Sequence, residues 1–570
     1  MLRRTLLIAT IALSSSAFAT PLTRYFPDHV LGVIEAKDLQ ESVAATGSFG
    51  EETQAFLGTL LNDALSSQMG KDLEIPGVLK DLTVRTMIGS IRDIAAAAYS
   101  VNGNPEFLAV VRMTPKNLIV NAFTKSFDDA IKTLPTKRKF REGNYLVDLS
   151  DGMAAGIGNN LFYISSNSDV LRGYLRRLNG QALPVLVNNP SYQAVAADTG
   201  DGFFKQMIHY SALAQLLGRD NSVPKRFVAI LKTLNVGGSV SSIVSDGLET
   251  RGLTQLNPNG GDTALYKLLT YAPEQLELLA DLPDTAPSAS VMATDTNGWL
   301  DYLQSWLPEM DLSANEQKDL VDVFSQLKTR LGTEWGVVNS NLPSPNSLAS
   351  SLGFGELGAS TLGLLGARFL GDTFSPNSET VFYAKTQDGA LILNDLETAF
   401  KNVFSADASP RQSSSDQTAP TVERTTIAGF EAVVVKSAVA LDRTARELEL
   451  WIINKNNTIV IGSNQTKLES YLAASPLLEN PLFKTFSLPQ RISGVQFSAP
   501  VRLERSEIDA MINASLKSLR AENDIPADLV SAFGNWFESW TSRTQAGYGY
   551  FLPENNKLHS YGKTGFSWNR

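Results

Sequence analysis

Residues 159–175 read NNLFYISSNSDVLRGYL, and residues 456–472 read NNTIVIGSNQTKLESYL. Eight of these seventeen positions are identical without a gap, whereas unrelated segments of ordinary composition would share about one residue over that length. Self-similarity at a fixed offset is the sequence signature of a repeated structural unit. The chain is therefore predicted to carry one module twice.

Upstream of this stretch, the two copies are expected to contain the same elements in the same order. Each begins with Pro-Asp and a strand, followed by a helix, a hairpin and a second helix. In the first copy Asn102-Gly103-Asn104 is a strong hairpin turn signal. The predicted elements of the first copy are the strand 30–36, the hairpin strands 93–101 and 107–114, and the helix 117–134. Those of the second copy are the strand 289–293, a helix around Trp299 and Trp306, the hairpin strands 360–369 and 379–386, and the helix 391–404.

Around and beyond the opening stretch, the correspondence continues. Strands 144–149 and 153–157 correspond to 430–436 and 447–453, and the Asn-Asn pairs that follow fit tight turns, since asparagine tolerates positive φ. An Asn-Pro turn then recurs at residues 189–192 and 480–483. A strand, two helices and a hairpin close each copy, at 203–210, 212–217, 224–234, 239–245 and 249–256 in the first and at 491–498, 505–519, 526–540, 546–552 and 558–566 in the second.

Hairpins separated by helices predict an α+β fold. Each module is expected to be a mainly antiparallel sheet with helices packed on it. The predicted domains are a first module at residues 20–275 and a second at residues 276–570. Residues 406–421, ADASPRQSSSDQTAPT, are polar and poor in apolar side chains, so they are expected to form a disordered loop within the second module.

The first residues, MLRRTLLIATIALSSSAFAT, predict a secretory signal peptide at residues 1–19. Arg3 and Arg4 precede a short apolar run, and cleavage is expected after Ala19. The run is too short for a transmembrane helix, which needs about 20 apolar residues. The chain has no cysteine, so it can form neither disulfides nor thiolate metal sites. We therefore expect an exported protein, periplasmic or at the cell surface, with no transmembrane segment after cleavage.

The charge of the chain disfavours nucleic acid as a partner. The chain has 49 basic and 59 acidic residues. Removal of the signal peptide takes away Arg3 and Arg4, which leaves 47 basic residues against 59 acidic ones and a net charge of −12. Such a surface does not neutralise phosphates. The basic cluster of the chain is expected to be a solvated turn, with an anionic lipid or polymer contact as the alternative; it comprises Lys132, Lys137, Arg138, Lys139 and Arg141.

No residues are predicted to be catalytic, cofactor-binding or metal-binding. The three histidines, His29, His209 and His559, lie far apart in the sequence. They lack the spacings typical of zinc sites, so structural roles are favoured. A serine hydrolase is disfavoured because no G-x-S-x-G motif is present.

Three short motifs imitate functional sites without the context that those sites need. Residues 353–358 match G-x-G-x-x-G, but prolines precede them and a strand is expected to follow, which favours a flexible loop. Lys563-Thr564-Gly565 stands too near the C-terminus for the penicillin-binding fold. Asp295-Thr296-Asn297-Gly298 begins like a calcium loop but lacks the later oxygen ligands, so a helix cap is expected.

The most unusual apolar feature is residues 526–540, whose expected helix has a broad aromatic face that includes Trp536 and Trp540. Packing in the core is favoured for this face and for Trp299 and Trp306. The alternatives are a groove for an apolar ligand and a docking surface.

The leader, the Pro-Asp strand, the repeated Asn-Asn stretch and the Asn-Pro turn together resemble a family of exported bacterial proteins of unknown function, known as an uncharacterised domain from cyanobacteria and other envelope-bearing bacteria. The resemblance implies no catalytic residues. We expect a non-enzymatic cell-envelope protein with a binding or scaffolding role, whose candidate partners are another envelope protein, a polymer or a lipid. The alternatives are a periplasmic carrier of an apolar ligand and, less favoured, a hydrolase.

Overall fold

The structure of the chain is a computed structural model. It describes residues 21–53, 55, 59, 90–114, 139–142, 144–148, 154–158, 160–220, 223–309, 314–328, 330–339, 380–406, 421–441, 444–500, 505–506, 508–509 and 527–568. Several predicted features lie outside the described residues: the signal peptide, the helix 117–134, the motif 353–358, residues 407–420 of the predicted loop and most of the helix 505–519.

The described chain combines helices with a single 20-stranded sheet, which agrees with an α+β fold. All strand pairs in the sheet are antiparallel. From one edge to the centre the strands are β4 (Lys139–Glu142), β5 (Asn144–Asp148), β6 (Ala154–Gly158), β7 (Leu161–Ser165), β3 (Asn104–Met113), β2 (Ile91–Val101), β1 (Gly32–Ala36), β8 (Phe204–Ile208), β9 (Val236–Val244) and β10 (Gly247–Gln255). From the other edge to the centre they are β14 (Thr421–Ile427), β15 (Phe430–Leu441), β16 (Thr444–Lys455), β17 (Thr458–Gly462), β13 (Thr380–Thr386), β12 (Leu331–Asn339), β11 (Ser288–Ala293), β18 (Gly494–Ser498), β19 (Thr544–Glu554) and β20 (Lys557–Phe566).

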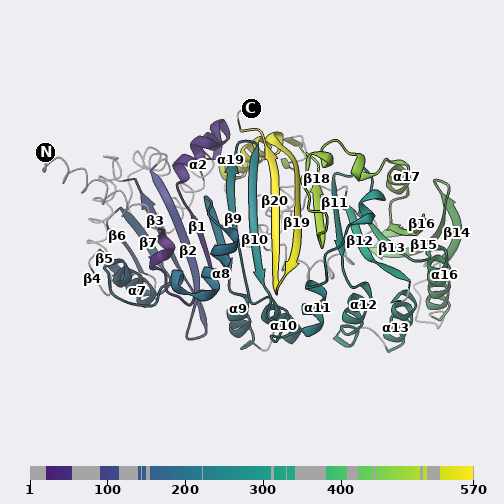
Figure 1. The fold of residues 1–570 in the computed structure, drawn as a ribbon, viewed down its shortest axis with the longest axis horizontal. Coiled ribbons are helices and arrows are strands. Elements are labelled where there is room, and N and C mark those ends of the chain that lie inside the picture. The colour runs from purple at the N-terminus through teal and green to yellow at the C-terminus, as the bar shows by residue number, and fades with distance from the viewer. Residues whose placement is uncertain are drawn as a thin grey trace.

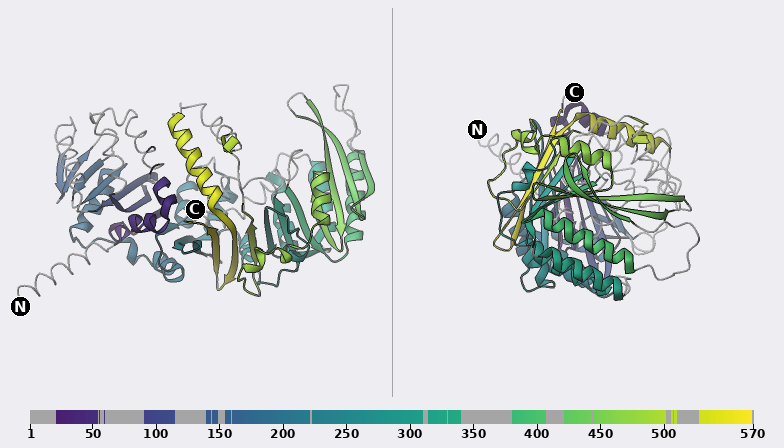
Figure 2. Two further views of the ribbon diagram at one scale, coloured as in Figure 1. Left: turned by 90° about the horizontal axis from the view of Figure 1, so that it is seen from above. Right: turned by 90° about the vertical axis from the view of Figure 1, so that its right-hand side faces the viewer.

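The two halves of the sheet, β1–β10 and β11–β20, have the same strand order, and they meet where β10 pairs with β20. Arg251 pairs with Tyr561 at the middle of this strand pair, and β9 and β19 flank it on either side. The described sheet is therefore arranged symmetrically about one central strand pair (Figure 1). It also twists, so that β14–β16 run across the direction of β19 and β20 when the sheet is viewed along its length (Figure 2).

Helices lie along both ends of the strands, with α9–α13 along one and α2, α17 and α19 at the other (Figure 1). In the first half the helical segments are η1 (Leu22–Tyr25), α2 (Leu39–Ala45), α7 (Ser168–Leu178), η3 (Leu186–Asn188), α8 (Pro190–Thr199), α9 (Tyr210–Leu217), α10 (Lys225–Leu234) and α11 (Thr263–Leu269). In the second half they are η4 (Glu277–Ala280), α12 (Thr296–Gln304), η5 (Leu307–Glu309), α13 (Ala314–Lys328), α16 (Gly389–Ala406), α17 (Gln465–Ala473), η7 (Leu477–Glu479), η8 (Phe483–Thr485) and α19 (Ala527–Arg543).

The repeated stretch forms a turn, a strand and a capped helix in both halves. Asn160 and Asn457 have φ of 60° and 63°, as the turn chemistry predicts. Asn167 caps α7 and Asn464 caps α17, each by accepting backbone N–H groups of the first turn. The recurring apolar positions of the helices are buried, and they are Leu171, Tyr174, Leu175, Leu468, Tyr471 and Leu472.

The recurring Pro-Asp and Asn-Pro motifs contact each other within each half. The Asn189 side-chain amide donates to the carbonyl oxygen of Asp28 at 2.8 Å, and Asn480 donates to that of Asp284 at 2.8 Å. Each asparagine oxygen also accepts the N–H two residues later, at 2.9 Å in both halves. One side chain thus starts a helical turn and ties it to the Pro-Asp segment that precedes the first strand of the half.

The prediction that residues 360–369 form a hairpin with residues 379–386 is wrong. Both edges of β13 are occupied, one by β12 and the other by β17. Residues 360–369 themselves lie outside the described residues. The apolar run at 360–369 gave the stronger strand signal, whereas β12, LGTEWGVVN, has a glycine at two of its positions and was missed.

The two outermost strands were not predicted either. β4 contains Lys139 and Arg141, which were assigned to a solvated turn, and the other members of that basic cluster lie outside the described residues. β14 begins at Thr421 and α16 ends at Ala406, the two ends of the predicted loop. Charged and hydroxyl side chains on edge strands weaken the apolar alternation that identifies interior strands.

Reciprocal helix contacts join the two halves. In one contact the Arg226 guanidinium of α10 lies 5.2 Å from the ring centroid of Trp306, which follows α12. In the other the Arg543 guanidinium of α19 lies 5.6 Å from the ring centroid of Phe49, and Arg543 pairs with Glu52 at 3.0 Å. In each half the helix just before the closing hairpin, α10 or α19, thus contacts the segment that follows the first α-helix of the other half, as two subunits do across a twofold axis.

Candidate functional site

A buried carboxylate lies in the core of the first half, on β1. Glu35 is 2% exposed, and its neighbour Thr23 in η1 is 1% exposed. The backbone N–H of Thr23 donates to Oε1 of Glu35 at 3.3 Å, and the Thr23 hydroxyl donates to Oε2 at 3.0 Å. A buried carboxylate is costly unless it is hydrogen-bonded or paired, and Thr23 supplies part of that compensation.

Two lysines and a second carboxylate extend this group toward the surface. Lys205 of β8 stands opposite Glu35 in the β1–β8 pairing. Its Nζ lies 2.5 Å from Oδ1 of Asp201, which follows α8. Nζ of Lys37 lies 3.9 Å from Oε2 of Glu35. The charges therefore alternate along a short path from the core to solvent.

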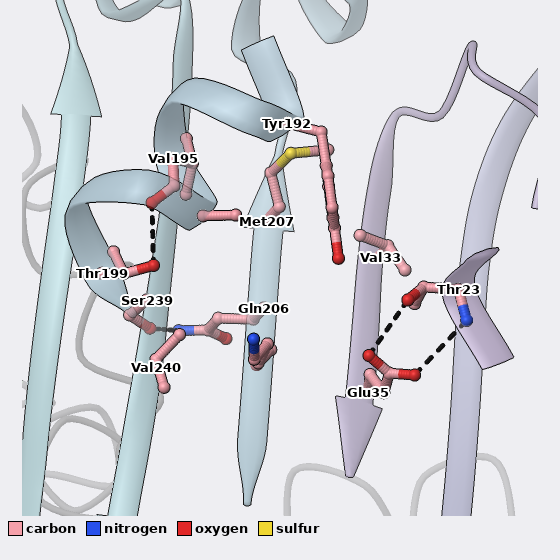
Figure 3. A pocket seen from close by; sticks show the side chains of 12 residues that line it. Thr23, Val33, Glu35, Tyr192, Val195, Thr199, Gln206, Met207, Ser239 and Val240 are labelled. Carbon is pink, nitrogen blue, oxygen red and sulfur yellow. Dashed lines mark hydrogen bonds between the residues drawn. The ribbon is translucent and has the colours of Figure 1, made fainter. Parts of the chain in front are cut away.

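Beside Glu35 is a cavity of about 20 Å³ (Figure 3). Its walls come from η1, β1, β8, β9 and α8, and they include Thr23, Val33, Glu35, Tyr192, Val195, Lys205 and Met207. A single water needs about 10–15 Å³, so this cavity is large enough for one. Figure 3 shows the ring of Tyr192 between Met207 and Val33.

A wider, open depression of about 410 Å³ adjoins the cavity at the end of α8. Tyr192, Ala196 and Lys205 line both spaces. Burial raises the pKa of the Tyr192 hydroxyl, and the nearby charges of Glu35 and Asp201 raise it further. This hydroxyl therefore stays protonated and can donate a hydrogen bond. We call the four polar residues Thr23, Glu35, Tyr192 and Lys205 the Glu35 cluster.

The corresponding positions of the second half are all apolar. Val291 faces Val495 in the β11–β18 pair, as Glu35 faces Lys205 in the β1–β8 pair. The N–H of Phe483 bonds to Asn480 as the N–H of Tyr192 bonds to Asn189. A backbone hydrogen bond shared by both halves aligns Thr23 with Leu279. The carbonyl of Phe26 accepts the N–H of Leu186, and the carbonyl of Leu282 accepts the N–H of Leu477. Thr23 lies three residues before Phe26, as Leu279 lies three residues before Leu282. The four counterparts belong to one core cluster and are Leu279, Val291, Phe483 and Val495.

Aromatic rings occupy the space in the second half that corresponds to the cavity. The centroids of Phe483 and Phe497 are 5.7 Å apart, and Phe486 stacks on Tyr548 at 4.2 Å. In the strand pairing Met207 and Gly238 hold the places of Phe497 and Tyr548. The first half therefore has less side-chain volume at this point, and we attribute its cavity to that difference.

No residue of the Glu35 cluster was identified from the sequence. A single acid in VIEA or a single lysine in a strand is unremarkable by itself. The available signal was the alignment of the two halves, in which a polar residue of one half falls on an apolar core position of the other. Equivalent residues of the two halves could be identified only from the strand register, because the segments between matching elements differ in length.

The three histidines occupy separate places. His209 caps α9: its Nδ1 accepts the N–H of Ala212 at 3.3 Å, and burial lowers its pKa. His29 is exposed beside Asp28, and His559 lies in β20. Within the described ranges, His, Asp and Glu form no group of three that could hold a metal ion.

The other candidate motifs have structural surroundings. Asp295 accepts the N–H of Gly298 at 2.9 Å and caps α12, as predicted. Lys563 and Gly565 belong to β20, where Lys563 pairs with Asp246 at 2.9 Å. Trp306 and Trp536 lie at the two contacts between the halves, and the indole of Trp536 donates to Thr53 at 3.0 Å. Neither lines the cavity or the depression.

Comparison with known proteins adds little to this picture. No family model matches the chain, and no curated protein matches it. Crystal form III of TP0453 is similar over 44% of this chain and 84% of its own, with 11% identity and a TM-score of 0.25. Crystal form I of TP0453 covers 43% and 82%, with 12% identity and a TM-score of 0.23. Similarity at this level supports no conclusion about fold or function. Among the helices of the described residues, none has the length and hydropathy needed to cross a membrane.

Proposed function

We propose that this chain is an exported, non-enzymatic protein of the cell envelope that binds a small ligand at the Glu35 cluster. One observation carries the proposal: four polar residues in the first half stand where the second half has Leu279, Val291, Phe483 and Val495. Burying polar and charged groups costs free energy unless they are compensated. The second half builds the same part of the fold with apolar residues at these four positions, and Glu334 of β12 holds its helical turn η4 by accepting the N–H groups of Glu277 and Leu278. This replacement accounts for the contact of Glu35 with Thr23 but not for Lys205 and Tyr192. Departures of this kind from core chemistry are expected at functional sites.

In this proposal the two halves are modules of one duplicated ancestor, at residues 20–275 and 276–570. The repeated stretch, the matching strand order and the reciprocal helix contacts support it. The second module has a scaffolding role. Its β20 covers the edge of β10, and an uncovered edge strand would be open to pairing with other chains.

The alternative function is a periplasmic carrier of an apolar ligand. The aromatic faces that contain Trp299, Trp306, Trp536 and Trp540 suggest it, and Trp306 and Trp536 lie at the contacts between the halves. A hydrolase stays the less favoured third hypothesis. Its candidate base, His209, has Ser211 and the Ala212 N–H as hydrogen-bond partners at the start of α9.

Native mass spectrometry of protein purified from its own envelope tests the binding function. We expect a co-purifying small molecule on the wild type and its loss from a variant that carries the second-half residues Thr23→Leu, Glu35→Val and Lys205→Val. A matched control, Lys563→Met, removes another lysine–aspartate pair and should keep the ligand. Wild-type protein that is always bare would contradict ligand binding. A lipid that the triple variant retains would favour the carrier instead.

Export has a separate test. Cell fractionation with N-terminal sequencing should place the mature chain outside the cytoplasm, starting at Thr20. A full-length chain that retains residues 1–19 in the cytoplasm would contradict the exported location.

A further inference from the structure

The charges at the depression differ in how firmly the protein holds them. Lys205 is 17% exposed and pairs with Asp201, whose side chain is 93% exposed. The other carboxylate, Glu35, is 2% exposed and accepts two hydrogen bonds from Thr23. Lys205 therefore lies between a fixed buried carboxylate and a carboxylate that is almost fully in water.

Asp201 can give up Lys205 to another anion at low cost. Its side chain is 93% exposed, so the freed carboxylate would be solvated at once. The departure would leave the ammonium of Lys205 without its described partner, in a place largely removed from water. A second anion would restore the pairing.

The surroundings of Asp201 favour negative charge at this point. The hydrogen bond from Lys205 lowers the pKa of Asp201, the charge of Lys205 lowers it further, and the charge of Lys37 adds to the effect. Two ammonium groups thus act on the position that the Asp201 carboxylate occupies. An incoming carboxylate would experience the same field.

The rest of the depression has apolar walls beside the amide of Gln193. Val187, Ala196, Ala197 and the ring of Tyr192 line it. Its volume of about 410 Å³ falls within the range of small-molecule sites, roughly 300–1,000 Å³. A short hydrocarbon or aromatic group would have partners there, while a second negative charge would not.

We propose that the depression binds a small amphiphilic carboxylate, whose carboxylate replaces Asp201 on Lys205 and whose apolar part lies against Tyr192, Ala196 and Ala197. This inference rests on the proposed ligand-binding function and names its ligand class. Asp201 acts as an internal competitor that occupies Lys205 while the site is empty. Glu35, directly opposite Lys205 on the neighbouring strand and buried, disfavours a second anion deeper in the core.

The test is a titration of the mature full-length protein with hexanoate, hexylammonium and hexanol, followed by NMR or calorimetry. Hexanoate should bind most tightly. Lys205→Met should weaken hexanoate binding about tenfold or more, since it removes a charge-assisted hydrogen bond. Asp201→Asn should tighten binding by a factor of about 1.5–5, the loss of a weak exposed competitor. Lys563→Met, at a pair of similar exposure, should leave it unchanged.

Each other result overturns the proposal. Hexylammonium binding as tightly as hexanoate would reverse the assigned charge. Weaker hexanoate binding in Asp201→Asn would make Asp201 a ligand partner rather than a competitor. Absence of hexanoate binding, or binding unaffected by Lys205→Met, would remove this ligand class. The proposed function stands independently if envelope-purified wild type carries a different ligand that the triple variant lacks.

Discussion

The same corner of the fold is polar in the first half and apolar in the second. In the first half Glu35 and Lys205 stand opposite each other beside a small cavity, whereas in the second Val291 and Val495 stand opposite each other beneath stacked aromatic rings. The strand register around both places is the same. Each half holds its first helical turn with a buried carboxylate, Glu35 of β1 in the first and Glu334 of β12 in the second, so the polar residues that lack a counterpart of this kind are Lys205 and Tyr192.

The largest expected effect is in the second half, where Val291→Glu would place a carboxylate in the apolar core. Val291 is 2% exposed, and its cross-strand partner Val495 offers no hydrogen bond or charge. An uncompensated buried charge costs about 3–5 kcal/mol, so urea unfolding should show a loss of that size. A loss below about 1 kcal/mol would show that the second half also tolerates a carboxylate here.

The converse change removes the buried carboxylate from the first half. Replacing Glu35 and Thr23 together, as Glu35→Val with Thr23→Leu, removes the carboxylate and its hydrogen-bond donor side chain at once. Exchange of a buried polar pair for apolar residues is often neutral or stabilising. The buried backbone N–H of residue 23 loses its acceptor, however, so the unfolding free energy should fall by about 1–3 kcal/mol, less than in Val291→Glu. A loss as large as that of Val291→Glu would show that folding depends on the Glu35 cluster.

The next effect concerns the strand pair that joins the halves. A Cβ on Gly247 would lie 2.0 Å from the carbonyl oxygen of Thr564 in β20. Gly247→Val must therefore push β10 from β20, and we expect a loss of about 3 kcal/mol in urea unfolding. Hydrogen exchange should show faster exchange in both central strands.

Gly562→Ala is the matched control for the central pair. A Cβ there would meet only the carbonyl oxygen of Tyr548, at the ordinary distance of 3.9 Å. Its stability should stay within about 0.5 kcal/mol of the wild type. If Gly247→Val and Gly562→Ala lose the same stability, the conformational freedom of glycine, and not the close approach of β10 to β20, would explain the loss at Gly247.

Much of the fold was predictable from the sequence because its local signals are strong. The Asn-Asn turns, the caps at Asn167 and Asn464 and the hairpin at Asn102-Gly103 depend on neighbouring residues alone. Strand β12 and the edge strands β4 and β14 were missed, since glycine and charged residues interrupt their alternation. The joining of both halves into one sheet depends on a pairing between residues about 300 apart, which no local pattern reports.

The Glu35 cluster could not be predicted for a related reason. Its four residues come from η1, β1, α8 and β8, and each is ordinary for its own element. Only the register of β1 with β8 and the packing of α8 bring them together. Asn189 and Asn480 are the opposite case, since both motifs were visible in the sequence and both form the same contacts.

A smaller and equal effect is therefore expected from Asn189→Ala and Asn480→Ala. Each removes a cap and a 2.8 Å hydrogen bond to the Pro-Asp segment that precedes the first strand of its half. Loss of such a cap costs about 1–2 kcal/mol. Hydrogen exchange by mass spectrometry should locate each loss in the half that carries the change. Unequal losses, differing by more than about 1 kcal/mol, would show that the two contacts have diverged in importance.

The smallest effect is a pH dependence that only the first half should show at this position. The N–H of His209 donates to the carbonyl of Leu31 at 2.8 Å, and in the second half the N–H of Ala499 donates to that of Pro287 at 2.8 Å. Burial lowers the pKa of His209, so the folded chain binds fewer protons than the unfolded chain below about pH 6.5. The neutral imidazole, which accepts the Ala212 N–H, contributes stability above that pH, and the contribution is lost as pH falls toward the lowered folded pKa.

Thermal unfolding measured between about pH 7.5 and 5.5 should show a loss of less than about 1 kcal/mol from His209, since this group is only partly buried. His209→Asn keeps a side chain that can cap α9 and should flatten this part of the profile, while the exposed His29→Asn should not. An unchanged profile in His209→Asn would assign the pH dependence to other groups.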